Sequence, residues 1–530
     1  MRSTSTLAKP VAATLLALAL GCGSAYAQGT QKVLRVVPHA DLKVLDPNQT
    51  SATITIMHGI SVYDMLFAWD RGLGVRPQMV EAYAASSDKL AYSFSLRPGL
   101  KFHDGTPVTA RDVVASLKRW MARDVIGQKL KEFTVSLEAK DDRVFQLILK
   151  EPYGWVEFSL AASGGIPAFM FREKEANVDP FTAFTETVGS GPFKFNKAEW
   201  VPGSKVVYDR NPDYVPRAEP ADGLSGGKIA RLNRVEYKVI PDAATAAAAL
   251  NAGEVDLVDQ PAIDMVPVVE RNKDIVVEVV GPIPAYGVLR PNHLYPPFNN
   301  VKARQALALM VNQRDYLQAG FGDEKWWQEC RSYFVCGAPF GTTLGSESYG
   351  KPDMAKAKQL LAEAGYKGEK IVIIATSEIA SLGAMAQVTA GKLKDLGVNV
   401  DLQMSDWGGV VTRRSKKDDP YQGGWHIFHT TAGGTSMHHP VTNFAVNTAC
   451  GGGNWFGWPC DEEADRLRNH FLLASEEATK KQAVEALHKR LWEVQPFALT
   501  GQYFQPTFWR RNVTGVLKAN LLVWWNIDKG

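Results

Sequence analysis

Apolar and polar positions alternate in short runs along much of the chain, and longer stretches with the spacing of amphipathic helices lie between these runs. In one such run, Tyr92, Phe94 and Leu96 alternate with polar side chains, which predicts a strand with one buried face. Pro98 and Gly99 follow and end the strand in a turn. Strands that alternate in this way with helices, without an internal repeat, predict an α/β protein.

Two of the expected helices are marked by their first residues. Thr109 is followed three residues later by Asp112, a variant of the capping box in which Asp replaces Glu or Gln, and this predicts a helix from Ala110 to about Met121. Asp353 begins a second helix, which Gly365 ends. Its apolar face would consist of Met354, Ala357, Leu360, Leu361 and Ala364.

The first 27 residues have the pattern of a secretory signal peptide. Arg2 and Lys9 precede an apolar run, and small residues close the segment at Ala27. A membrane anchor would need roughly 20 apolar residues, more than this run contains. We therefore expect cleavage after Ala27 and a periplasmic protein. Cys22 leaves lipidation as an alternative, although the preceding residues lack the leucine usual in lipoproteins.

Composition and charge narrow the possible functions. The chain has 530 residues, of which 45% are hydrophobic and 22% are charged, as in an ordinary globular protein with a large core. This length corresponds to about three domain-sized units or to an elaborated two-lobe architecture. Because 59 basic residues are nearly balanced by 56 acidic ones, the surplus that phosphate neutralisation requires is missing, and we expect no nucleic-acid partner.

The four cysteines beyond residue 27 fall into two close pairs. They are Cys330 and Cys336, and Cys450 and Cys460. An even number of paired cysteines in an exported protein predicts two disulfide bonds that each close a short loop. A zinc site is the alternative, but five and nine intervening residues do not resemble C-x2-C pairs.

Common catalytic and cofactor motifs are missing from the sequence. It contains no G-x-S-x-G, H-E-x-x-H, EF-hand or Walker A pattern. Residues 223–228 are rich in glycine, but Asp222 stands in place of the glycine that begins a Walker A motif. We therefore expect neither an enzyme nor a bound cofactor. A secreted hydrolase built from residues distant in sequence stays an alternative, because such sites leave no local motif.

Four segments, spread over most of the chain, carry a family resemblance. They are YSFSLRPGLKFHDGTPVTARDVV (92–114), GSGPFKF (189–195) with RNPDY (210–214), FNNVKARQAL (298–307) and YGKPDMAKAKQLLAEAGY (349–366). In this order they resemble the peptide/nickel class, family 5, of extracytoplasmic solute-binding proteins that serve ABC importers.

The resemblance implies an α/β, two-lobe periplasmic-binding-protein fold of class II, with an extra inserted subdomain and two crossing strands between the lobes. The expected boundaries are 28–284 for lobe I, about 72–188 for its inserted subdomain, 285–499 for lobe II, and 500–530 for a return to lobe I. It also implies a small-molecule or peptide-like ligand between the lobes and an ABC transporter permease as partner. We expect a monomer.

Residues 404–458 are rich in aromatic side chains and glycines and form the candidate ligand surface. Asp406-Trp407-Gly408 resembles the acid-tryptophan-glycine element of the family, which implies an indole that faces the ligand. Arg413 and Arg414 follow on an expected helix and can offer a planar fork to a carboxylate, unless they only form a solvated face. The expected ligand-binding residues are Trp407, Asp406, Arg413, Arg414, Trp425, His429, Thr430 and Thr431. For Trp425, a position in the core is an equal alternative.

One departure from the family pattern concerns the substrate. In peptide-binding members, an aspartate beyond the tryptophan pairs with the α-ammonium of the ligand. Here the corresponding residues 430–436 read TTAGGTS and contain no acid. A buried ammonium without a counter-charge loses a hydrogen bond worth about 1.5 to 3 kcal/mol. We therefore expect a ligand without a free α-amine, or a pairing role for another acid such as Asp406.

Four histidines suggest a second kind of ligand. His426, His429, His438 and His439 lie in the same segment, and imidazole is a good ligand for nickel. A nickel-chelate binding protein is therefore an alternative. Because no carboxylate or cysteine lies among them at a useful spacing, we expect no metal site.

Overall fold

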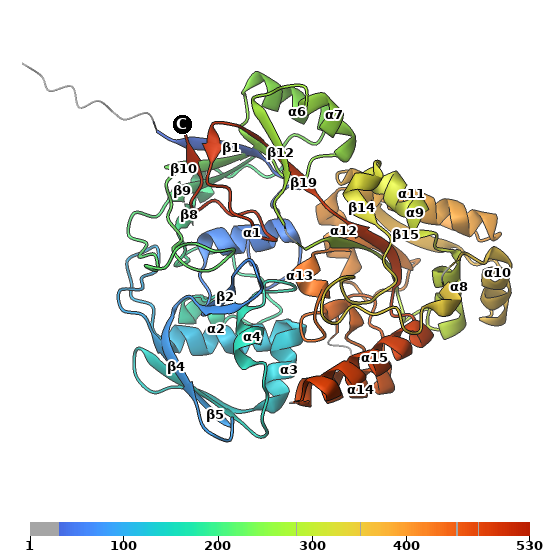
Figure 1. Ribbon diagram of the computed structural model, residues 1–530, viewed down its shortest axis with the longest axis horizontal. Helices are drawn as coiled ribbons and strands as arrows, with labels where there is room; N and C mark the ends of the chain where they lie inside the picture. Colours follow the sequence, from blue (N-terminus) through green and yellow to red (C-terminus); the bar gives the residue numbers. More distant parts are fainter. Residues whose placement is uncertain (1–30, 282, 350, 452–453, 475) are drawn as a thin grey trace, which may run out of the picture. The chain divides into compact units, whose positions relative to one another are not determined.

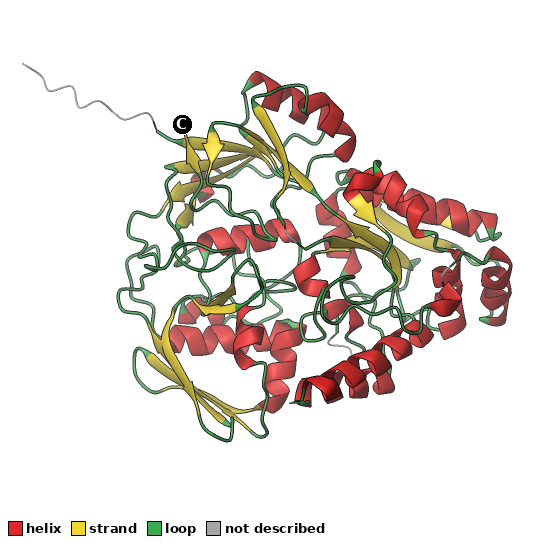
Figure 2. Ribbon diagram, viewed as in Figure 1, coloured by secondary structure: helices red, strands yellow, loops and turns green. Residues whose placement is uncertain are grey.

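The computed structural model describes residues 31–281, 283–349, 351–451, 454–474 and 476–530. The expected signal peptide, residues 1–27, and the lipidation alternative at Cys22 lie outside these residues. Within the described residues, three larger β-sheets of seven, six and four strands carry the architecture, with helices packed against them (Figures 1 and 2).

The seven-stranded sheet brings together the two ends of the chain. Its order is β12-β19-β11-β1-β10-β9-β8, and β1 lies parallel to both β10 and β11. The strands are β1 (Val33–Val37), β8 (Phe193–Phe195), β9 (Lys205–Arg210), β10 (Arg234–Lys238), β11 (Leu257–Val258), β12 (Ile275–Val279) and β19 (Pro506–Arg510). Around it are α1 (Thr53–Val62), α6 (Ala243–Ala252) and α7 (Val266–Val269).

The six-stranded sheet is built from the second half of the chain, in the order β14-β18-β13-β17-β15-β16. Its strands are β13 (Ala285–Pro291), β14 (Trp327–Gln328), β15 (Ile371–Thr376), β16 (Val400–Ser405), β17 (Ile427–Ala432) and β18 (Ala498–Tyr503). Its helices are α8 (Val301–Met310), α9 (Gln313–Phe321), α10 (Met354–Glu363), α11 (Ala380–Asp395), α12 (Trp407–Arg414), α13 (Gly434–Met437), α14 (Glu462–Leu473) and α15 (Glu477–Val494). Every residue of β15 is buried, as expected of a central strand covered on both faces.

The four-stranded antiparallel sheet, in the order β4-β5-β7-β6, lies within residues 72–188. It consists of β4 (Val80–Ala85), β5 (Ala91–Leu96), β6 (Thr134–Ala139) and β7 (Val144–Leu149). Next to it are α2 (Ala110–Arg123), α3 (Val125–Phe133), α4 (Val156–Ala161) and α5 (Glu173–Ala176). Figure 1 shows β4 and β5 together with α2 and α3 in one part of the molecule.

The local sequence predictions are confirmed. Strand β5 has alternating burial, and α2 begins with a capping box in which the backbone N–H of Thr109 donates to Asp112 Oδ2 over 2.7 Å. Helix α10 follows Asp353, whose side chain accepts a hydrogen bond from the backbone of Lys356 over 2.8 Å. In each case residues only three positions apart determine where the helix begins.

The chain crosses between the seven-stranded and six-stranded sheets twice. It leaves the first between β12 and β13 and returns between β18 and β19. Strand β18 stays paired with β13 up to Tyr503, beyond the expected boundary at residue 499. Only Phe504 and Gln505 separate β18 from β19.

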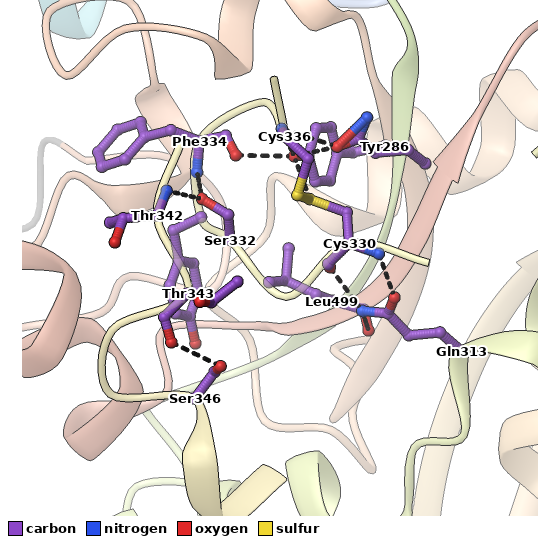
Figure 3. The surroundings of a disulfide bond; sticks show 12 residues. Tyr286, Gln313, Cys330, Ser332, Phe334, Cys336, Thr342, Thr343, Ser346 and Leu499 are labelled. Atoms are coloured by element: carbon purple, nitrogen blue, oxygen red, sulfur yellow. Dashed lines mark hydrogen bonds between the residues drawn. A yellow bond between two sulfur atoms is a disulfide. The ribbon is translucent and has the colours of Figure 1, made fainter. Parts of the chain in front are cut away.

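Both expected cysteine pairs are bonded. The Cα atoms are 6.0 Å apart in Cys330–Cys336 and 4.7 Å apart in Cys450–Cys460. The first disulfide lies against the six-stranded sheet at Tyr286 of β13 (Figure 3).

Tyr286 connects this disulfide loop to two strands of the sheet. Its hydroxyl lies 2.7 Å from Oε1 of Gln502 on β18 and 2.8 Å from the carbonyl oxygen of Phe334 in the loop. The backbone N–H of Cys336 donates to the same Gln502 oxygen over 2.9 Å. The strands β13 and β18, each of which leads to a crossing, are thus joined through one buried hydroxyl.

Among the described residues, none of the helices combines the length and the hydropathy that a transmembrane helix requires.

Candidate functional site

A cavity of about 650 Å³ is lined by residues from both the seven-stranded and the six-stranded sheet regions. Its walls include the segments after β1 and β11, the start of α11, the end of β17, and residues of both crossings between the sheets. This volume lies within the range of small-molecule sites. A molecule bound here would contact both parts of the chain.

Four of the eight predicted ligand-binding residues line this cavity: Trp407, Arg414, Thr430 and Thr431. Trp407 is the first residue of α12, and its backbone N–H donates to Glu378 Oε2 over 2.9 Å. The two threonines lie near the end of β17. Elements that are separate in the sequence therefore meet at one wall.

Arg414 is the last residue of α12 and is only 2% exposed. Its guanidinium carbon lies 5.0 Å from the ring centroid of Phe456 and 5.2 Å from that of Trp407. Burial lowers the pKa of Arg414 to about 9, so the side chain is still cationic at neutral pH. It makes no hydrogen bond or ion pair within the described part of the chain.

Asp406 does not line the cavity. Its Oδ1 accepts hydrogen bonds from the backbone of Gly409 over 2.7 Å and from Lys43 Nζ over 2.8 Å, so it caps α12 and pairs across the two sheet regions. The hydrogen bond from Lys43 lowers the pKa of this carboxyl. The pairing of Asp406 with a ligand ammonium, which the sequence left open, has no support from this position.

Arg413 also points away from the cavity. Its guanidinium donates to the carbonyl oxygens of Gly423 and Gly424 over 2.9 and 2.7 Å. It lines a separate surface depression together with Lys43 and Lys416. Of the two adjacent arginines, only Arg414 therefore reaches the cavity wall.

Trp425 and His429 belong to the core of the six-stranded sheet region and do not line the cavity. Trp425 is fully buried, edge-to-face with Phe428 at 4.9 Å. His429 is 1% exposed, and its Nε2 lies 2.8 Å from Oγ1 of Thr389. Burial lowers the pKa of His429 to about 3, so it is a neutral packing residue.

Two further histidines of the nickel alternative, His438 and His439, are not arranged as ligands. His438 packs edge-to-face on Trp69 at 5.7 Å, and His439 packs on Trp155 at 4.6 Å. Across the described residues, no group of three or more His, Cys, Asp or Glu side chains could hold a metal ion. These imidazoles fill an aromatic contact between α4 and the segment after β17.

Sequence reasoning missed the polar residues on the opposite wall. His39 and Asp259 both line the cavity, and His39 Nδ1 lies 2.6 Å from Asp259 Oδ2. They are brought together because β1 and β11 are parallel neighbours, so the segments that follow both strands meet at one edge of the sheet. The sequence signal was weak, since each is a single polar residue after a short apolar run.

A close approach between the two parts also borders the cavity. A Cβ atom at Gly164 would lie 2.2 Å from Ser436 Oγ and 2.7 Å from Ser436 Cα. Gly164 comes from the segment after α4, and Ser436 belongs to α13. The missing side chain at Gly164 permits this contact.

Comparisons with known proteins agree with this architecture. The chain is 40% identical over 493 residues to the "Probable peptide ABC transporter periplasmic-binding protein y4tO" of Sinorhizobium fredii, and the match covers 92% of each protein. The periplasmic binding protein DppA from Helicobacter pylori, in complex with peptide STSA, has a similar structure, with a TM-score of 0.78, 21% identity, and coverage of 94% of this chain and 98% of that one.

A third similar structure is the PBP AgaA from A. tumefacien R10 in complex with agropinic acid, with a TM-score of 0.77, 21% identity, and coverage of 94% of this chain and 99% of that one. These likenesses confirm the expected α/β, two-lobe fold. Residues 74–455 match the family described as "Bacterial extracellular solute-binding proteins, family 5 Middle". The cavity between two sheet regions and the match over most of the chain lead to one conclusion: the protein belongs to the family 5 bacterial extracellular solute-binding proteins.

Proposed function

We propose that this protein captures a small organic or peptide-like solute in the cavity and delivers it to the permease of an ABC importer. The observation that carries this proposal is the composition of the cavity wall, which includes both sheet regions and both crossings. A solute that contacts both lobes in the closed form, but only one in the open form, favours closure by that difference in affinity. The closed protein is then the form that the permease receives.

The lobe assignment is part of this proposal. Lobe I comprises the seven-stranded sheet with the inserted four-stranded sheet, and lobe II comprises the six-stranded sheet. The match to extracellular solute-binding proteins supports a periplasmic location. The proposal includes export by a signal peptide that is cleaved after Ala27. The two disulfides suit an oxidising compartment. We propose that the protein acts as a monomer.

Trp407, Arg414, Thr430 and Thr431 are the proposed ligand contacts from lobe II. All four line the cavity and are at least partly buried. A solute that packs on the indole of Trp407 would also lie near Arg414, because their side chains are in contact. Lobe I would contribute the His39–Asp259 pair on the opposite wall.

Native mass spectrometry of protein purified from the periplasm, without refolding, tests the function. We expect a retained small molecule whose removal enlarges the radius of gyration in small-angle scattering and whose return reduces it. The same molecule should raise the melting temperature and be recovered unchanged after incubation. Chemical conversion of the molecule would favour a secreted enzyme, and an unchanged radius at saturation would contradict the closing mechanism.

A further inference from the structure

Two arginines of lobe II have the same burial but opposite surroundings. Arg290 on β13 is fully buried and Arg414 is 2% exposed, and burial lowers the pKa of each to about 9. Arg290 donates to the carbonyl oxygens of Phe456 and Ala445 over 2.7 and 2.9 Å, and also to that of Pro496 over 3.1 Å. Within the described residues only its Nη2 is without a partner, so the three acceptors of Nε and Nη1 explain Arg290 as a structural cation.

Arg414 has no such acceptors. Its Nε and Nη2 are buried without a hydrogen-bond partner. The rings of Trp407 and Phe456 attract the guanidinium electrostatically, but a ring does not replace an oxygen acceptor for each N–H group. Because buried polar groups nearly always have a partner, a buried cation without one needs an explanation.

A second unpartnered donor lies beside it. The indole Nε1 of Trp455 is buried without an acceptor, and the ring centroid of Trp455 is 6.0 Å from the guanidinium carbon of Arg414. Both residues line the cavity. Arginine and tryptophan side chains can only donate, so the group that satisfies both must be an acceptor.

The geometry of the free donors favours one kind of acceptor. Nε and Nη2 lie on the same edge of the guanidinium plane, where their N–H groups are parallel and match the two oxygens of a carboxylate. A neutral amide or hydroxyl would satisfy fewer of these donors and would leave the positive charge uncompensated. Among the acids that line the cavity, Glu378 is the one from lobe II, and its Oε2 already accepts a hydrogen bond from the backbone N–H of Trp407 over 2.9 Å. Residues 430–436 contain no acid.

We propose that the cavity selects solutes that carry a carboxylate, held by the free edge of Arg414 and by the indole N–H of Trp455. This inference rests on the proposed binding function and names its substrate class, organic acids with a body that packs on Trp407. Both donors belong to lobe II. The carboxylate can therefore bind lobe II before the lobes close.

Matched pairs of acids and their primary amides test the proposal on the full mature protein: benzoate and benzamide, hippurate and hippuramide, and N-acetyl-leucine and its amide. Thermal shift and calorimetry measure binding to the wild type and to the variants. We expect the acids to bind and raise the melting temperature, and each amide to bind roughly ten- to a hundredfold more weakly, as expected for loss of a hydrogen bond to a charged group.

The variants distinguish the effect of the two parallel N–H donors of Arg414 from the effect of its positive charge. Arg414→Gln should weaken acid binding at least about tenfold, and Arg414→Lys, which keeps the charge but loses the fork, should also weaken it. Trp455→Phe, which replaces the indole by a phenyl ring and so removes the N–H donor, should give a smaller loss. Lys416→Gln removes an exposed charge nearby and should leave acid binding unchanged.

The other possible results show whether the carboxylate assignment or the proposed binding function is wrong. Equal binding of acids to the wild type and to a folded Arg414→Gln protein overturns the carboxylate assignment. Preferential binding of the amides, or a retained native ligand without an acidic group, overturns it while leaving the solute-binding function intact. If no acid or amide binds and no molecule is retained, both the assignment and the proposed function are contradicted.

Discussion

Lys43 and Asp406 form an ion pair that joins the seven-stranded and six-stranded sheet regions, with Nζ 2.8 Å from Oδ1. Lys43 follows β1, and Asp406 caps α12. The stem of Lys43 also packs closely on Gly408, where a Cβ atom would lie 2.5 Å from Lys43 Cδ. In the closing mechanism that we propose, this pair forms only when the two sheet regions meet, so it would favour closure. Pairs this exposed contribute about 0.2 to 1 kcal/mol.

Replacement of Lys43 by methionine should therefore weaken ligand binding about two- to fivefold. The loss should shrink at high salt, because ions screen exposed charges. The hydrogen bond from Lys43 lowers the pKa of Asp406, so the stabilisation is present above the ordinary carboxyl pKa and is lost as pH falls through the lowered one. Calorimetry at two salt concentrations measures the effect, and a loss that is independent of salt would contradict the electrostatic explanation.

The contrast between Arg414 and Arg290 predicts opposite effects on stability. Arg414→Met removes a buried cation without acceptors, so the ligand-free protein should gain about 1 kcal/mol or more in its free energy of unfolding. Arg290→Met leaves three carbonyl oxygens without their hydrogen-bond donor, and the free energy of unfolding should fall by about 2 to 4 kcal/mol. Urea unfolding of both variants decides this. Destabilisation by Arg414→Met would assign that residue a structural role.

Buried histidines should make the protein less stable in mild acid. Burial lowers the pKa of His58 to about 3 and that of His438 to about 4. Between those values and about 6.5, the unfolded chain binds protons that the folded chain does not. The free energy of unfolding therefore falls as pH decreases, by about 1.4 kcal/mol per pH unit for each such histidine.

His58→Gln should reduce this dependence by one proton relative to the wild type. Urea unfolding from pH 7 to pH 5 measures both slopes. Identical slopes for His58→Gln and the wild type would show that this imidazole is protonated in the folded protein.

A larger side chain at position 164 should hold the lobes apart. Valine there would place side-chain atoms against the backbone of Ser436, so Gly164→Val should increase the radius of gyration and weaken ligand binding at least tenfold. A Cβ atom at Gly154 would meet no other atom within 4 Å, and Gly154→Ala serves as the control. A closed form of Gly164→Val with normal affinity would contradict the contact as a requirement for closure.

The sequence predicted correctly those parts of the fold that are determined by residues close to one another in the chain. The capping box at Thr109 and Asp112 lies within one helical turn, and the four family segments imply the fold through their order. It could not choose between Arg413 and Arg414, because adjacent helical residues point about 100° apart and the facing surface is set by tertiary packing. The pairing of His39 with Asp259, 220 positions apart, depends on the order of strands in the sheet.

The buried hydroxyl of Tyr286 has a mechanical consequence for the hinge (Figure 3). Because Tyr286 and Gln502 fasten β13 to β18 and to the disulfide loop, the lobe II ends of both crossings move as one rigid frame. Rotation in the proposed closing motion would then be absorbed outside this frame, at the crossing after β12 and at Phe504 and Gln505, where Pro506 limits backbone freedom. With both crossings anchored in one frame, the closing motion that we propose would be a rotation about a single axis, without twisting or sliding of the lobes past each other.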